Sequence, residues 1–145
     1  MEVVNELGSS PEARDAFFES LDPHAPLVMV NLLKFKDKAE YADGRDSDLT
    51  GAQAYALYSE VVSQMIVDLG GTLVHGGMVT NLLVGQVEEL WDVVGLVEYP
   101  NPGAFREMIE SDAYQVAHVH REAGLAGQLN LSTTSPGYAS QRAAD

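Results

Sequence analysis

The segment that most restricts the fold is an apolar run of strand length, LVMVNLLKFK, from Leu27 to Lys36. Side chains alternate between the two faces of a strand, and here both alternating sets are apolar. A strand of this kind must be covered on both of its faces. The first set is Leu27, Met29, Leu33 and Phe35, and the second is Val28, Val30 and Leu32.

The order of the elements along the chain predicts a ferredoxin-like domain. The pattern is strand, helix, strand, strand, helix, strand, which is typical of one four-stranded antiparallel sheet with both helices on one face. We therefore expect a single α+β domain. The expected bounds are strands at 27–36, 72–85, 91–100 and 128–135, a helix at about 52–69, and a helix from about 104 with a joint near Ser111.

Two helices cover only one face of such a sheet, so the second apolar face needs another partner. The simplest partner is a second copy of the same sheet, and we therefore predict a symmetric homodimer. Two additions flank the domain. An N-terminal helix is expected over about 10–21, with Ser10 as its cap and Pro11 in its first turn, and a flexible tail over about 135–145.

Composition excludes several classes of function. The formal net charge is −14, from 22 acidic and 8 basic side chains, which argues against binding to nucleic acid or to anionic membranes. The absence of cysteine excludes disulfides, thiolate nucleophiles and iron–sulfur clusters. Without a phosphate loop, a dinucleotide fingerprint, a nucleophile elbow or a chelating histidine pair, we expect no cofactor and no metal. No signal peptide or membrane-spanning run is evident, so a cytoplasmic location is expected.

Several motifs in order resemble the DUF1330 family. They are QAYALYSEVV, then GGTLVHGG, then VGLVEYPNPGAFREMIESDAYQ followed by Arg121. The resemblance extends from about Leu27 to Ser132 and implies a ferredoxin-like protomer in a dimeric α/β barrel. It implies no settled reaction, because relatives by fold include cofactor-free monooxygenases, isomerising and decarboxylating enzymes, and haem-handling proteins. This chain departs from the family pattern at His75, where arginine is frequent, and in its longer loop between Asp37 and Gly51.

Three residues are candidates for catalysis. His75 stands beside glycines that leave space for a base or a hydrogen-bond donor in a cavity. Glu98 shares an apolar register with Leu96, where burial would raise its pKa and make it a proton shuttle. Arg121 would supply a local positive charge to bind a carboxylate or an enolate, or would pair with Glu98 in a purely structural role.

Three further residues are candidates for binding a substrate. Asn31 interrupts an apolar register and needs hydrogen-bond partners, which are either the sheet or a ligand oxygen. Tyr58 falls within the apolar stripe of its helix, although its hydroxyl could reach a pocket. Tyr114 either packs across the joint near Ser111 or lines the pocket with Arg121.

Two histidines on the last helix are weaker candidates. A helical wheel separates a stripe that includes Val116 and Val119 from a stripe that includes His118. We expect the valine stripe to be buried, and His118 to lie in solvent near Glu122. His120 borders the valine stripe, where a hydrogen-bonded, partly buried histidine is expected.

These observations predict a small-molecule site in each protomer, either between the sheet and a helix or inside the dimer barrel. The ligand would be an anionic or carbonyl-bearing organic molecule, and the reaction a cofactor-independent oxygenation or isomerisation. The alternative is a non-catalytic binding or structural dimer. Convergence of His75, Glu98 and Arg121 on one cavity is the observation that would separate these readings.

Overall fold

The structure is a computed structural model, and it describes residues 1–134. The predicted tail at 135–145 lies outside the described residues. The elements are α1 Pro11–Glu19, β1 Leu27–Phe35, α2 Gly51–Asp68, β2 Thr72–Met78, β3 Val93–Tyr99, α3 Pro102–Glu110, α4 Asp112–Gly124 and β4 Leu125–Thr134.

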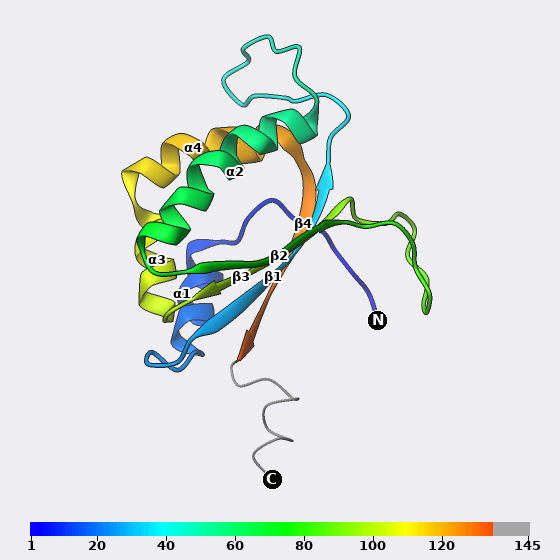
Figure 1. The fold of residues 1–145 in the computed structure, drawn as a ribbon. Coiled ribbons are helices and arrows are strands. Elements are labelled where there is room, and N and C mark those ends of the chain that lie inside the picture. The colour runs from blue at the N-terminus through cyan, green and yellow to red at the C-terminus, as the bar shows by residue number, and fades with distance from the viewer. Residues whose placement is uncertain (135–145) are drawn as a thin grey trace.

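The four strands form one antiparallel sheet in the order β2-β3-β1-β4. Figure 1 shows all the helices on one side of this sheet. The predicted ferredoxin-like α+β fold is therefore confirmed. None of the helices in the described part of the chain has the length and apolar character needed to cross a bilayer.

Side-chain caps fix where the helices begin. The Ser10 hydroxyl accepts a hydrogen bond from the Ala13 amide at 3.1 Å and starts α1. Thr50 and Gln53 form a reciprocal capping box at the start of α2. Ser111 caps α4 and also ends α3, so the predicted joint separates two helices. Each cap satisfies amides that have no partner within the helix.

A close contact between α2 and α4 sets the geometry of the helix layer. A Cβ atom on Gly124 would lie 2.3 Å from the Gly51 carbonyl oxygen and 2.9 Å from the Tyr55 nitrogen. Only glycine permits this approach of two backbones. The contact holds the first turns of α2 beside the last turn of α4, which carries Arg121.

The two valines of α4 that were expected to be buried are in fact exposed. The side chain of Val116 is 74% exposed and that of Val119 is 42% exposed. The buried residues of α4 include Tyr114, Ala117 and Ala123. The prediction was wrong because α4 packs closely through small residues, and valines do not fit at such a contact.

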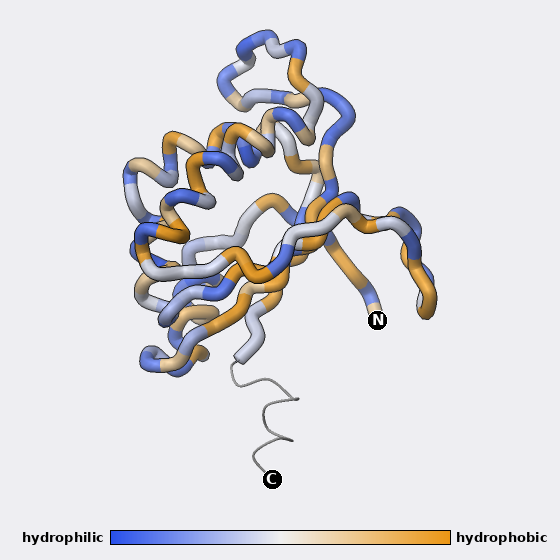
Figure 2. The backbone as a smooth tube through the Cα atoms, viewed as in Figure 1, coloured by the Kyte–Doolittle hydropathy of each residue, from blue (hydrophilic) through white to orange (hydrophobic). Residues whose placement is uncertain are grey.

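The second strand is shorter than predicted. It ends at Met78, and residues 79–92 leave the sheet as a projecting arm (Figure 1). A hydrogen bond from the Val79 amide to the Asp92 carbonyl closes the base of this arm at 2.9 Å. Figure 2 shows apolar residues in this arm. Leu83, which belongs to the arm, is 98% exposed. The apolar residues after Met78 do not continue the strand, because a strand also needs a neighbouring strand with which to form hydrogen bonds.

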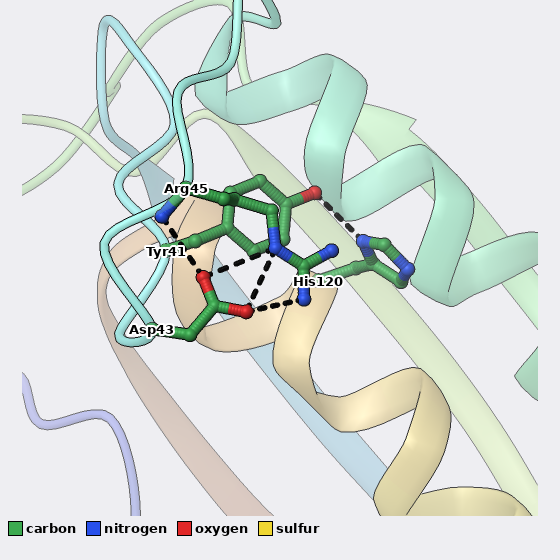
Figure 3. Close-up of polar contacts among 4 residues, drawn as sticks. All are labelled: Tyr41, Asp43, Arg45 and His120. Atoms are coloured by element: carbon green, nitrogen blue, oxygen red, sulfur yellow. Dashed lines mark hydrogen bonds and ion pairs between the residues drawn. The ribbon is translucent and has the colours of Figure 1, made fainter.

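The long loop before α2 packs against α4 through Tyr41 (Figure 3). The Tyr41 hydroxyl and His120 Nδ1 are 2.7 Å apart. The Arg45 guanidinium stacks over the Tyr41 ring at 4.6 Å and pairs with Asp43. His120 therefore has a local structural partner, as its place beside the apolar stripe suggested.

The N-terminal segment runs along the outer edge of the sheet before α1. Glu6 and Gln128 exchange backbone hydrogen bonds of 3.2 and 2.9 Å. The Trp91 indole donates to the Asn5 side-chain oxygen at 2.6 Å. The segment then continues to α1 on the helix side of the sheet (Figure 1). Residues 4–9, which we call the N-terminal strap, thereby close one side of the helix layer.

Candidate small-molecule site

A cavity of about 650 Å³ lies between the sheet, the helix layer and the N-terminal strap. Its volume falls in the range of small-molecule pockets. Its apolar wall is mostly aromatic and includes residues of α1, α2, β3 and α3. These apolar residues are Phe17, Phe18, Met29, Tyr55, Tyr58, Tyr99, Phe105 and Met108.

A chain of polar side chains crosses the cavity wall from the sheet to α4. Asn31 donates to the Gly95 carbonyl at 3.3 Å, and its oxygen accepts from Gln128 at 2.9 Å. The Gln128 side-chain oxygen in turn accepts from Arg121. Arg121 also donates to the Leu7 carbonyl at 2.6 Å, so the guanidinium joins α4, the sheet and the N-terminal strap.

His118 lies one helical turn before Arg121 and lines the same cavity. Its Nε2 is 3.3 Å from Arg121 Nη1, and its Nδ1 is 3.3 Å from a Glu122 oxygen. A guanidinium can only donate, so Nε2 accepts and Nδ1 carries the proton. Burial lowers the pKa of His118, and the nearby Arg121 charge lowers it further against an opposing effect of Glu122. The imidazole is therefore neutral at neutral pH.

Two cavity tyrosines, Tyr55 and Tyr58, act as neutral hydrogen-bonding groups. The Tyr58 and Tyr114 hydroxyls are 3.0 Å apart. Burial raises the pKa of Tyr58 well above its ordinary value and that of Tyr55 to about 12. The charge of Arg121 partly opposes the effect on both groups. Phenols in this state donate or accept hydrogen bonds and do not act as bases at neutral pH.

A second arginine, Arg14 of α1, also lines the cavity. Its Nε is the one buried side-chain nitrogen or oxygen within residues 1–134 that has no hydrogen-bond partner. The carboxylate of the next residue, Asp15, is bound instead to Arg106. An arginine without an acceptor in a partly buried position leaves a polar atom unsatisfied.

The two cavity arginines have no ion pair with a described carboxylate, whereas most other described cations do. Lys34, Lys36, Arg45 and Arg106 each contact at least one carboxylate. Among the described residues, no carboxylate lies at ion-pair distance from Arg14 or Arg121. Two glutamates, Glu6 and Glu122, belong to the cavity lining, and both are exposed to solvent.

The structure brings together four of the six residues singled out in the sequence. Arg121, Asn31, Tyr58 and Tyr114 all line the cavity. The hydrogen bonds of Asn31 show that it anchors the sheet, and its side chain remains in the cavity wall. Its part in binding a ligand stays a prediction.

His75 and Glu98 lie on the opposite face of the sheet. Glu98 pairs with Val28, and His75 pairs with Leu96, so both belong to the register that points away from the helices. The His75 ring lies over Gly77, where a Cβ atom would come within 2.9 Å of Nε2. The expected meeting of Glu98 with Arg121 does not occur, because the sheet separates them. His75, Glu98 and Arg121 therefore do not converge on the cavity, which contains Arg121 alone of the three. The catalytic roles of His75 and Glu98 stay predictions.

The described residues contain no group of three or more histidine, aspartate or glutamate side chains that could hold a metal ion.

Comparison with known proteins establishes the family. Residues 44–133 match DUF1330, a domain of unknown function. The protein belongs to the DUF1330 family. The crystal structure of RPA0582, a protein of unknown function from Rhodopseudomonas palustris, is 31% identical, with a TM-score of 0.81 over 92% of this chain and 99% of that chain. Its methylated form is 32% identical, with a TM-score of 0.83 over 94% and 98% of the two chains.

A more distant structure agrees with the DUF1330 fold assignment. It is a dimeric ferredoxin-like protein of unknown function from Bacteroides fragilis, which is 10% identical. The TM-score is 0.50, over 75% of this chain and 95% of that chain. At this level of identity the likeness concerns the fold alone. No curated protein matches the sequence.

Sequence reasoning missed four contributors to the cavity of this DUF1330 protein: Arg14, Tyr55, His118 and Gln128. Gln128 could have been identified from the sequence, since it is a polar side chain in an otherwise apolar strand segment and therefore needs hydrogen-bond partners. Tyr55 lies one turn before Tyr58 on α2, so the two residues share a face of that helix. Arg14 had no such signal, because its place depends on the path of the N-terminal strap, which lies before the family match at residue 44.

Proposed function

We propose that the protein binds a small organic acid in this cavity. The supporting observation is that the Arg121 guanidinium donates its hydrogen bonds to neutral acceptors, which are the Leu7 carbonyl and the Gln128 side-chain amide. A guanidinium binds a carboxylate through two parallel hydrogen bonds, which are stronger than bonds to neutral acceptors. A ligand carboxylate would therefore compete well for Arg121.

The remaining wall favours an acid with an apolar body. Aromatic side chains from five elements line the space, and the Tyr55 and Tyr58 hydroxyls are neutral donors. The net charge of −14 gives an anion no long-range attraction to the protein. Binding would depend on the local guanidinium and on burial of the apolar body.

The test is binding of benzoate to the full chain, measured by calorimetry and by the shift in thermal midpoint. A ligand that binds only the folded state raises the midpoint as its concentration exceeds the Kd. We expect Arg121→Gln to weaken binding by about 10-fold or more, because a charge-assisted hydrogen bond is lost. The matched control is Arg106→Gln, since Arg106 pairs with Asp15 and Glu110. Equal losses in both variants would contradict the proposal.

We further propose that the protein catalyses a cofactor-independent isomerisation or oxygenation, which one observation favours. His118 is neutral and adjoins Arg121, so a ligand carbonyl held by the guanidinium would have a proton acceptor nearby. Phenylpyruvate, an enolisable carbonyl acid, is a suitable substrate analogue. Proton NMR would reveal turnover as faster exchange or new signals relative to buffer. An unchanged spectrum for bound acid would instead favour a binding module.

We also propose that the protein works as a homodimer joined through the open face of the sheet. This face carries no helix, and its registers on β1, β3 and β4 are largely apolar. The titratable groups that the registers of β1, β2 and β3 place on it are Lys34, His75 and Glu98. Lys34 is paired with Glu89 and Asp92, in a chain with 22 acidic residues. A face so low in charge suits association with its own copy. The apolar residues are Val28, Val30, Leu32, Val94, Leu96, Leu129 and Leu131.

A further inference from the structure

We propose that the natural ligand of the cavity is a dicarboxylic acid, with one carboxylate held by Arg121 and the other by Arg14. This inference rests on the proposed binding of an organic acid and names its class. Nothing in the family match covers Arg14, because the match begins at residue 44.

The first argument is the unsatisfied state of Arg14. A guanidinium is charged at all ordinary pH values and offers five donors. The Arg14 Nε is buried without a partner, which costs free energy unless an acceptor is supplied. The neighbouring carboxylate of Asp15 is already engaged by Arg106 at the surface. A bound anion is the acceptor that the cavity lacks.

The second argument is that the two arginines belong to different walls. Arg121 extends from α4 and is tied to the sheet through Gln128. Arg14 comes from α1, which follows the N-terminal strap. The aromatic residues Phe17, Phe18 and Phe105 line the same cavity, and Phe18 packs against Phe105 with ring centroids 5.7 Å apart. A molecule with an apolar body and two acidic groups matches this distribution of charge and aromatic surface.

The experiment compares benzoate with phenyl phosphate and with the ortho, meta and para benzenedicarboxylates, so that several separations of the two charges are sampled. Affinities are measured by calorimetry for the full chain and for Arg14→Gln, Arg121→Gln and Arg106→Gln. We expect at least one dicarboxylate to bind about 10-fold or more tightly than benzoate. Arg14→Gln should remove that advantage and leave benzoate within about twofold. Arg121→Gln should weaken both classes, and Arg106→Gln neither.

The possible failures are distinguishable. If benzoate binds and no dicarboxylate binds more tightly, the dicarboxylate proposal is wrong and the organic-acid proposal stands. If Arg14→Gln weakens benzoate as much as the dicarboxylates, Arg14 is not a separate anchor. If phenyl phosphate binds most tightly and is unaffected by Arg14→Gln, the ligand is a phosphate ester. If no carboxylate binds, both proposals fail.

A folding control accompanies these variants. Within residues 1–134 the buried Nε of Arg14 has no hydrogen-bond partner and its guanidinium makes no ion pair, so Arg14→Gln should keep the wild-type thermal midpoint. Arg14→Lys preserves the charge but not the planar fork, and it should restore part of the preference for dicarboxylates. A full loss in Arg14→Lys with an unchanged midpoint would mean that charge does not hold the second group.

Discussion

The surroundings of His118 determine how its charge responds to pH. Burial and the adjacent Arg121 both lower its pKa below the ordinary value of 6.5, while Glu122 opposes them. The unfolded chain therefore binds this proton more readily than the folded protein does. The stability gained from a neutral His118 is complete above about pH 6.5 and is lost as the pH falls through the folded pKa.

We predict that the His118 resonance titrates below 6.5 in NMR spectra of the folded protein. Arg121→Gln should raise this pKa, because a nearby positive charge is removed. Glu122→Gln should lower it, because a negative charge is removed. The His118→Gln spectrum assigns the resonance among the four histidines. A shift of the same sign in both variants would refute the proposed geometry.

For single residues, the sequence predicted what kind of partner a side chain needs better than it predicted which residues the side chain contacts. The need of Asn31 for polar partners followed from its place in an apolar register, and its bonds to Gly95 and Gln128 meet that need. The separation of Glu98 from Arg121 depends on which face of the sheet the helices cover. Alternation places Glu98 and Leu96 on one face, but both faces of this sheet are apolar, so hydrophobicity could not say which face lies toward α4.

Among the elements, the contact between α2 and α4 depends on two glycines. We predict that Gly124→Ala lowers the free energy of unfolding by about 1–3 kcal/mol, because the new Cβ would overlap backbone atoms that cannot move aside. Urea unfolding measures the change. The control is Gly76→Ala in β2, where a Cβ would meet nothing within 4 Å. Comparable losses in both variants would mean that packing at Gly51 is not the cause.

The same contact explains which features of the helices could be foreseen. Caps depend on local residues, so the cap at Ser10 and the joint near Ser111 were predicted from sequence and are confirmed. The buried side of α4 depends on how closely its partner approaches. Hydrophobicity favoured Val116 and Val119, whereas a backbone contact at Gly124 selects small residues for that side.

The whole molecule presents its open sheet face to solvent as a single chain. Leu131 lies on this face opposite Val30 and is 49% exposed. Val116 is more exposed, at 74%, but lies on the outer side of α4. If two copies join through their sheets, a charge at Leu131 would be buried in the interface, and a charge at Val116 would remain in water.

We therefore predict that light scattering of the wild-type protein at micromolar concentration gives twice the 15.6 kDa of one chain. Leu131→Asp should shift the population toward monomer, and Val116→Asp should leave it dimeric. A monomeric wild type would refute the dimer without affecting the cavity, since its described lining comes from one chain. If Leu131→Asp remains dimeric while Val116→Asp dissociates, the interface lies on the helix layer. In that case the second copy would lie next to the acid bound in the cavity. In a dimer joined through the sheets, the sheet would separate the acid from the second copy.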